Sequence, residues 1–262
     1  MLCPSLAHAQ FSELESLCDE LRASPEFQAK SAIRLASVSY ENVPLENRYG
    51  MPGDDCAAFA VGDGYQLLAM EGMLPAFVAS DSRAAGWSSV MVNVSDIAAM
   101  GGRPTAIVNA YWHNDRDQAE ELLFHIKRAC DAFGIAFAGG HSSLHVQNAP
   151  NLAVAITGHA NKLLSSHHVQ AGQRLFMLTD LNGSWHGEHP YWGCILGKTP
   201  EQIKHQWQIP AELAELDLVE GAKDISNGGI LGTLVMMLEL TGCGADIDLS
   251  AIPKPDNDLI RW

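Results

Sequence analysis

The sequence predicts two domains, an α/β domain followed by an α+β domain, and three observations support this. At 262 residues the chain exceeds the usual size of one domain. Short apolar runs alternate with amphipathic helix patterns through its first part. A polar link, SSHHVQAGQ at 165–173, precedes a second series of apolar segments. We therefore expect a helical lead-in at 1–30, a first domain at 31–163 and a second at 172–262.

The elements follow from the spacing of apolar residues. Helical spacing predicts a helix over 11–30 that Pro25 interrupts, and a second over 115–134 that Gly134 closes. Past the link we expect a helix over 230–242, which Gly242 or Gly244 ends. Short apolar runs predict strands at 64–70, 88–94, 104–112, 134–140, 151–160 and 174–180.

Charge and composition exclude several classes of function. The formal net charge is -15, so the field of the protein repels a nucleic acid backbone, and we expect no such partner. A divalent-cation site is one reason to gather carboxylates, although a solvated acidic surface explains most of the charge. No run approaches the roughly 20 apolar residues that cross a bilayer, so we expect no membrane partner. The six scattered cysteines and the lack of a signal-peptide pattern predict a cytoplasmic protein.

Two segments place carboxylates beside strand or helix boundaries. In MPGDDCAAF (51–59), Gly53 frees the backbone, and Asp54 and Asp55 form a pair that suits a hard cation. An Asp pair in a turn is also a common cap or surface feature. In VNVSDIAAMGGRP (92–104) we expect a strand, then Ser95 as the N-cap of a short helix with Asp96 in its first turn. A simple capped helix is the plainer interpretation.

Two further segments have the features of phosphate-binding loops. AGGHSS (138–143) offers close backbone approach at Gly139 and Gly140, followed by His141 and the hydroxyl of Ser142. A tight turn explains the same pattern. In the segment 221–239 a glycine-rich helix start presents main-chain amides, with polar and glycine positions at Asp224, Ser226, Asn227, Gly228 and Gly229.

These four segments, in this order and spacing, resemble the superfamily of aminoimidazole ribonucleotide (AIR) synthetase, thiamine-monophosphate kinase and selenophosphate synthetase. The resemblance covers roughly residues 30–262 and is most specific in SDIAAMGGRP. It implies a two-domain fold whose N-terminal strands pair across a homodimer into a barrel, with ATP between the domains. It also implies that Asp54, Asp55 and Asp96 hold Mg²⁺ ions at the nucleotide phosphates.

The sequence departs from the superfamily pattern at two metal positions. Glu71 stands where kinase-like members carry an aspartate, and His141 stands where they carry an aspartate after the glycine pair. Imidazole suits Mn²⁺ or another divalent ion better than Mg²⁺. His141 is alternatively a phosphate contact, an acid-base group or a structural residue. The chain also ends soon after the glycine-rich helix, so we expect an incomplete C-terminal domain.

The predicted function is therefore an ATP- and metal-dependent kinase or ligase acting on a small molecule. The metal ligands would be Asp54, Asp55, Glu71 and Asp96, and the catalytic residues Asp54 and His141. The alternative is a nucleotide-binding regulatory protein of the same fold. A hydrolase using Ser142 with His141 is disfavoured, because the sequence has no G-x-S-x-G elbow. The predicted ATP-binding residues are Gly53, Asp54, Asp55, Asp96, Gly139, Gly140, His141, Ser142, Asp224, Ser226, Gly228 and Gly229.

Overall fold

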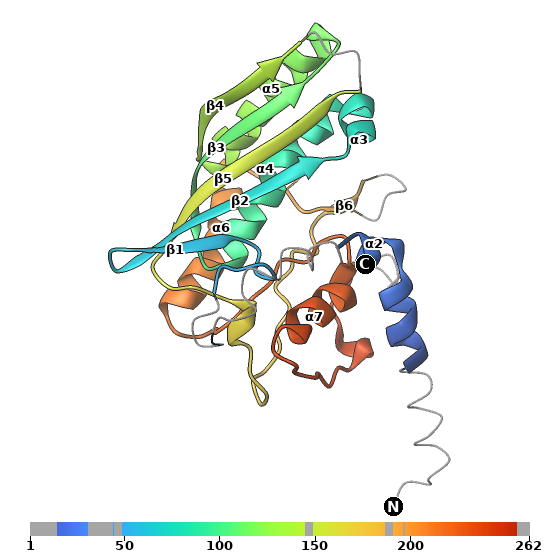
Figure 1. The fold of residues 1–262 in the computed structure, drawn as a ribbon, viewed down its shortest axis with the longest axis vertical. Helices are drawn as coiled ribbons and strands as arrows, with labels where there is room; N and C mark the ends of the chain where they lie inside the picture. The colour runs from blue at the N-terminus through green and yellow to red at the C-terminus, as the bar shows by residue number, and fades with distance from the viewer. Residues whose placement is uncertain are drawn as a thin grey trace, which may run out of the picture.

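One five-stranded sheet with helices on one face forms the centre of the molecule (Figure 1). The structure is a computed structural model and describes residues 15–30, 44, 49–144, 149–186, 191–195 and 197–255. The strand order is β1-β2-β5-β3-β4, and only the β3–β4 pair is parallel. The strands are β1 (Ala57–Val61), β2 (Gly64–Met73), β3 (Arg103–Trp112), β4 (Ala136–Ser143) and β5 (Asn151–Ala160).

The parallel pair is connected as the sequence predicts. Because parallel neighbours need a crossover, β3 and β4 are joined through helix α5 (Arg116–Phe133). Asp115 caps α5 by accepting from the amide of Gln118, and Gly134 ends it with a left-handed φ of 73°. The predictions of this helix and of strands near 64–70, 104–112, 134–140 and 151–160 are confirmed.

The predicted strand at 88–94 is wrong, because these residues lie inside the long helix α4 (Ser82–Ala99). Asp81 begins that helix by accepting from the amide of Ala84. The helix packs on the sheet with one side and on α5 with another, so residues on several of its sides are buried. A short apolar run does not distinguish such a helix from a buried strand. Ser95 is consequently no N-cap, and Asp96 lies in the last turn of α4 rather than in a first turn.

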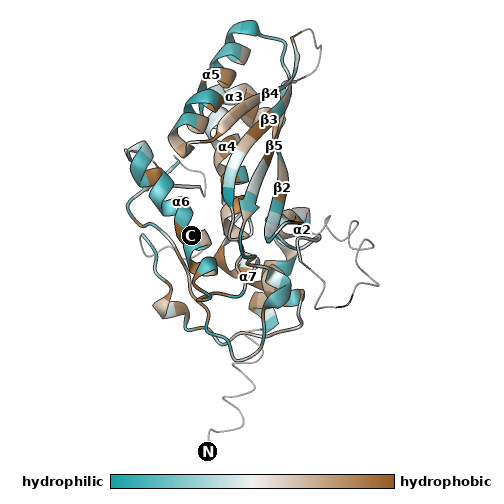
Figure 2. Ribbon diagram, turned by 90° about the vertical axis from the view of Figure 1, so that its left-hand side faces the viewer, coloured by the Kyte–Doolittle hydropathy of each residue, from teal (hydrophilic) through white to brown (hydrophobic). Residues whose placement is uncertain are grey.

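The opposite face of the sheet carries exposed apolar side chains. Figure 2 shows the strands turned by 90° and coloured by the hydropathy of each residue. The register aligns Met70, Ala155 and Val108 across three strands, and Met70 is 70% exposed. Side chains on the helix-covered side, such as Leu67 and Ile107, are fully buried. We call the outer side the open face; its large exposed side chains are Phe59, Val61, Leu68, Met70, Val108 and Trp112.

The C-terminal part of the chain contributes a helix, α6, that packs against helices of the first part. Helix α6 (Pro200–Glu215) begins with a capping box of Thr199 and Gln202, as the preceding polar residues allow. It packs against α4 and α5, and the Arg103 guanidinium donates to both carboxylate oxygens of Glu215, at 2.9 Å for Nη2. Helices α3 (Pro75–Ser80) and α7 (Gly229–Glu239), strands β6 (Ser184–Trp185) and β7 (Trp192–Gly193), and the short turns η3 (Ser166–His168) and η4 (Leu249–Ala251) complete this list.

The strand predicted at 174–180 is also wrong. This segment pairs with no other strand in the described ranges, and Phe176 is 78% exposed. An apolar run without a neighbouring strand cannot form a ladder. Near the N-terminus, residues 15–23 are helical and α2 (Pro25–Lys30) follows, so the interruption at Pro25 is confirmed. Among the described residues, no helix is both long and apolar enough to cross a membrane.

Candidate functional site

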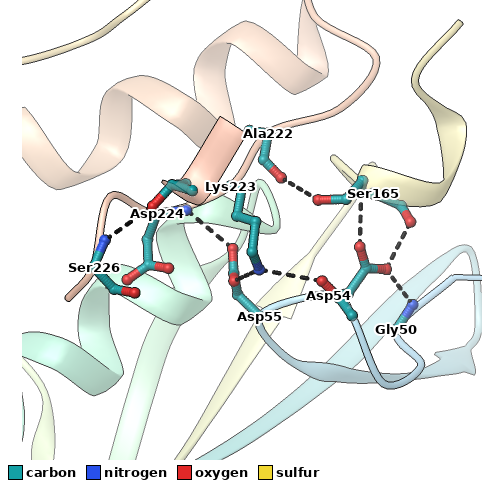
Figure 3. A network of polar contacts seen from close by, with 11 residues as sticks. Gly50, Asp54, Asp55, Ser165, Ala222, Lys223, Asp224 and Ser226 are labelled. Atoms are coloured by element: carbon teal, nitrogen blue, oxygen red, sulfur yellow. Dashed lines mark hydrogen bonds and ion pairs between the residues drawn. The ribbon is translucent and has the colours of Figure 1, made fainter. Parts of the chain in front are cut away.

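Three carboxylates from distant parts of the chain meet at one place. Asp55 precedes β1, Asp96 lies in the last turn of α4, and Asp224 lies in the loop before α7. One oxygen of each lies within 4.8 Å of the others. Figure 3 shows Asp55 and Asp224 next to each other. We call these three residues the carboxylate cluster.

Asp96 lies where a negative charge is unfavourable without a nearby cation. Its side chain is buried, and the last turn of α4 carries the negative end of the helix dipole. Gly101, with a left-handed φ of 74°, ends the helix directly after it, since the amide of Gly101 donates to Ala98. The tight exit into β3 fixes the direction of this last turn. A positive charge beside Asp96 would therefore stabilise the local structure.

Asp54 is turned away from the cluster and binds the linker between the two parts of the chain. Its carboxylate accepts from the amides of Gly50 (2.8 Å) and Ser166 (2.7 Å) and from the hydroxyl of Ser165 (2.6 Å), as drawn in Figure 3. Burial raises the pKa of Asp54, although these hydrogen bonds and the His167 charge oppose that shift. Both oxygens of Asp54 are therefore occupied by protein donors.

Asp55 is bonded to the loop that carries Asp224. The ammonium of Lys223 donates to Asp55 Oδ1, and the amide of Asp224 donates to Asp55 Oδ2 at 3.1 Å. Lys223 also donates to the carbonyl of Gly53 at 3.1 Å. Burial lowers the pKa of Lys223, but the charge and hydrogen bond of Asp55 outweigh it, so that pKa is raised overall. The ammonium therefore stays charged.

The donor set of the cluster fits a hard divalent cation. Mg²⁺ and Mn²⁺ prefer carboxylate oxygens, and the cluster supplies three of them. The neighbouring Cys56 thiol is buried, and burial together with the Asp96 charge raises its pKa, so it stays a neutral thiol. A neutral thiol is a poor metal ligand. The site therefore has oxygen chemistry rather than sulfur chemistry.

Glu71 lies outside the group of three. The register places it opposite Val154, on the helix-covered side of β2, where it is partly buried. The structure brings together Asp55, Asp96 and Asp224 but adds neither Glu71 nor Asp54 to them. Their roles as metal ligands stay predictions.

The AGGHSS segment lies at another place, the far end of the sheet. Arg103 begins β3 just after Asp96, whereas Ala110 aligns with His141 on β4. The seven residue-to-residue steps from Arg103 to Ala110 span about 23 Å of strand. His141 is exposed, and its ring centroid lies 5.9 Å from that of Trp112 on the open face. In a single chain, His141 and Ser142 are therefore remote from the cluster.

The glycine pair of this segment has a local structural explanation. The β3–β4 register shifts between Ile107 and Asn109, and Gly139 and Gly140 take φ values of 114° and 149° at that bulge. A Cβ on Gly140 would lie 1.9 Å from the backbone oxygen of Asn109. Only glycine therefore fits at 140, whatever else the segment binds.

The glycine-rich start of α7 lies next to the cluster through Asp224. Gly228 is the N-cap of the helix, without a capping side chain, and Gly229 has a φ of 65°. The amide of Gly229 donates to Ser226 at 2.8 Å. The backbone amide of Ser226 donates to Thr233 Oγ1 at 3.4 Å. Phosphate binding by Ser226 stays a prediction. Lys223 is not among the residues predicted from the sequence, in which the one signal for it is its position directly before Asp224.

Comparison with known proteins gives the family. Residues 53–160 match the model for AIR synthase related protein, N-terminal domain, and residues 195–261 match its C-terminal domain. An uncharacterized protein of Synechocystis sp. is 42% identical over 80% of this chain and 66% of its own length. The thiamine-monophosphate kinase of Haemophilus influenzae is 27% identical over 80% of this chain and 67% of its own length.

A solved structure shares the fold. T. maritima PurL complexed with ATP superposes with a TM-score of 0.54 and 20% identity, covering 74% of this chain and 31% of that one. The chain spans about two thirds of the two curated relatives described above. On the two matching family models, this chain belongs to the AIR synthase related family.

Proposed function

We propose that this protein is an ATP- and divalent-metal-dependent enzyme that activates or phosphorylates a small metabolite. The observation that carries the proposal is the convergence of Asp55, Asp96 and Asp224 from three separate segments. The T. maritima structure of the same fold was solved with ATP, and the H. influenzae relative is a kinase. Both fit a phosphate-handling site.

In this proposal the cluster holds Mg²⁺ or Mn²⁺, which neutralises charge on the nucleotide phosphates. Phosphoryl transfer needs mainly positioning and charge neutralisation from the protein. The backbone before α7, from Ser226 to Gly229, lies beside Asp224 and would contact phosphate oxygens. Asp54 would bind no metal itself but would hold the loop that carries Asp55 in place through its hydrogen bonds to Ser165 and Ser166.

We also propose a homodimer formed through the open face. Its exposed apolar side chains extend over β1, β2 and β3, and burying them releases water from apolar surface. His141 lies on the same face, because it aligns with Ala110 and its ring neighbours Trp112. A dimer of this kind would place His141 at the subunit interface, whereas Ser142 aligns with the buried Tyr111 and lies on the other side of β4. Sedimentation that finds only monomers at every concentration would contradict it.

Calorimetric titration with ATP tests the function directly. Titrations with Mg²⁺, with Mn²⁺ and with a chelator should give binding only when a metal is present, because the cluster alone repels phosphates. Equal binding with the chelator would overturn the role of the cluster. Phosphorylated product or ADP formed with a small-molecule substrate would then identify the reaction.

The second candidate function is a nucleotide-binding regulatory protein without turnover. The observation that favours it is the remote position of His141, a predicted catalytic residue, relative to the carboxylate cluster. Metal-dependent ATP binding combined with no ATP consumption across a metabolite screen would support this alternative. Any substrate-dependent ATP consumption by the purified chain would exclude it.

A further inference from the structure

The turn η3 contacts both of the segments that bring Asp55 and Asp224 together. The backbone amide of Ser166 donates to Asp54, the neighbour of Asp55, at 2.7 Å. The hydroxyl of Ser166 donates to the carbonyl of Ala222, two residues before Asp224, at 3.1 Å (Figure 3). Ser166 is fully buried, so water does not replace either hydrogen bond when it is lost. One residue therefore connects the two segments.

The backbone of the turn also lies close to the second of these segments. A Cβ on Gly221 would lie 2.5 Å from the backbone oxygen of Ser165. The φ of Gly221 is not in the left-handed region, so the close approach of the two backbones, and not the backbone conformation, requires glycine here. The amide of Asp224 donates to Asp55 at 3.1 Å. These contacts fix the course of the segment 221–224 beside the loop that carries Asp55.

Fixed ligands affect both the affinity of a site and its choice between metal ions. Ligands that are already in place lose little conformational freedom when an ion binds, so the affinity is higher. Mg²⁺ requires nearly ideal octahedral geometry, whereas Ca²⁺ accepts irregular geometry. A site that loses its fixed geometry should therefore lose more affinity for Mg²⁺ than for Ca²⁺.

We propose that Ser166 is a positioning residue of the metal site. Its hydroxyl holds the segment 221–224 beside the loop of Asp55, so that the carboxylates of the cluster keep fixed positions relative to one another. The inference rests on the proposed function, since it needs the cluster to bind metal. Ser166 acts only through the carbonyl of Ala222 and contacts no ion.

The test compares the affinities of the full chain for Mn²⁺, Mg²⁺ and Ca²⁺. Binding of Mn²⁺ is measured from the electron paramagnetic resonance signal of the free ion, without nucleotide, and Mg²⁺ or Ca²⁺ then displaces the bound ion. Ser166→Ala removes the hydroxyl and keeps the backbone amide. Ser89→Ala is the matched control, because Ser89 is equally buried and donates to the carbonyl of Gly86 at 3.0 Å inside α4. Thermal unfolding shows whether each variant is folded.

A second pair of variants disturbs the same place without removing a hydrogen-bonding group. Gly221→Ala pushes the segment away from the turn, because its Cβ would collide with the backbone of Ser165. Gly244→Ala is its matched control, since a Cβ there meets no atom within 4 Å. If Ser166→Ala does not fold, this pair decides by the same criteria.

We expect Ser166→Ala and Gly221→Ala to weaken Mg²⁺ binding about tenfold, since a buried hydrogen bond contributes about that factor, and to weaken Ca²⁺ binding by a smaller factor. Both controls should bind each ion as the wild type does. Unchanged Mg²⁺ binding by folded Ser166→Ala, equal losses for Mg²⁺ and Ca²⁺, or the same loss in Ser89→Ala would overturn the role of Ser166 alone. No ion bound by the wild type, with or without ATP, would overturn the proposed function as well.

Discussion

The two ends of the sheet carry glycine-rich motifs of the same superfamily, yet they are organised in opposite ways. At the end near Asp96, three segments far apart in sequence converge on three carboxylates, of which that of Asp96 is buried. At the end near His141, one segment forms a bulge on an edge strand and its side chains are exposed. The first end is a site within one chain. The second becomes a site only if something covers the open face.

The largest expected effect is a difference in ATP affinity between a variant at the Asp96 end of the sheet and a variant at the His141 end. Changing Asp96 to Asn should weaken metal-dependent ATP binding at least about a thousandfold, or about 4 kcal/mol, because a neutral amide replaces a buried ligand. His141→Asn should leave the affinity within about threefold in a monomer, since 141 lies far along β3. Calorimetry on both variants measures the difference. An equal loss in His141→Asn would mean that a second copy brings this residue to the cluster.

The next effect tests whether Asp54 supports the cluster from outside it. Asp54→Ala should lower the free energy of unfolding by about 3 kcal/mol, because the Ser165 hydroxyl and the amides of Gly50 and Ser166 lose their shared acceptor. Denaturant unfolding measures this. Asp54→Asn, which keeps one acceptor oxygen, should lose less and still bind Mn²⁺. If the folded Asn variant binds no Mn²⁺, Asp54 is a metal ligand as the resemblance implies.

The smallest effect concerns the bulge at the far end. Gly140→Ala should cost about 2 kcal/mol of stability, because the new Cβ collides with the backbone of Asn109. Gly139→Ala is the matched control: its Cβ meets no atom within 4 Å, so only the φ of 114° opposes it. Metal binding should be unchanged in both. A loss of metal binding without a loss of stability would link the bulge to the cluster.

The sequence allowed the cluster to be predicted only in part. Asp55, Asp96 and Asp224 were all candidate residues, because their motifs resemble those of one superfamily. Their convergence depends on α4, whose middle was predicted as a strand, because a short apolar run within a helix buried on several sides resembles a buried strand. The order of strands and the docking of α6 depend on contacts between residues distant in sequence, which periodicity does not report.

The sequence could not predict which of Asp54 and Asp55 joins the carboxylate cluster, for a different reason. Adjacent identical side chains carry the same sequence signal, and only their partners distinguish them. Asp54 contacts the linker at Ser165 and Ser166, whereas Asp55 contacts Lys223 and Asp224. Lys223 itself was missed because a single lysine in a loop is ordinarily a surface residue.

The three hydrogen bonds to Asp54 also connect the segments before and after the sheet to the carboxylate cluster. Gly50 lies just before the sheet begins, and Ser165 and Ser166 lie just after its last strand, so one carboxylate holds the entry and the exit of the domain together. The next residue along the chain is Asp55. Any force or movement in the segment that follows the sheet therefore reaches a residue of the cluster through a single peptide bond.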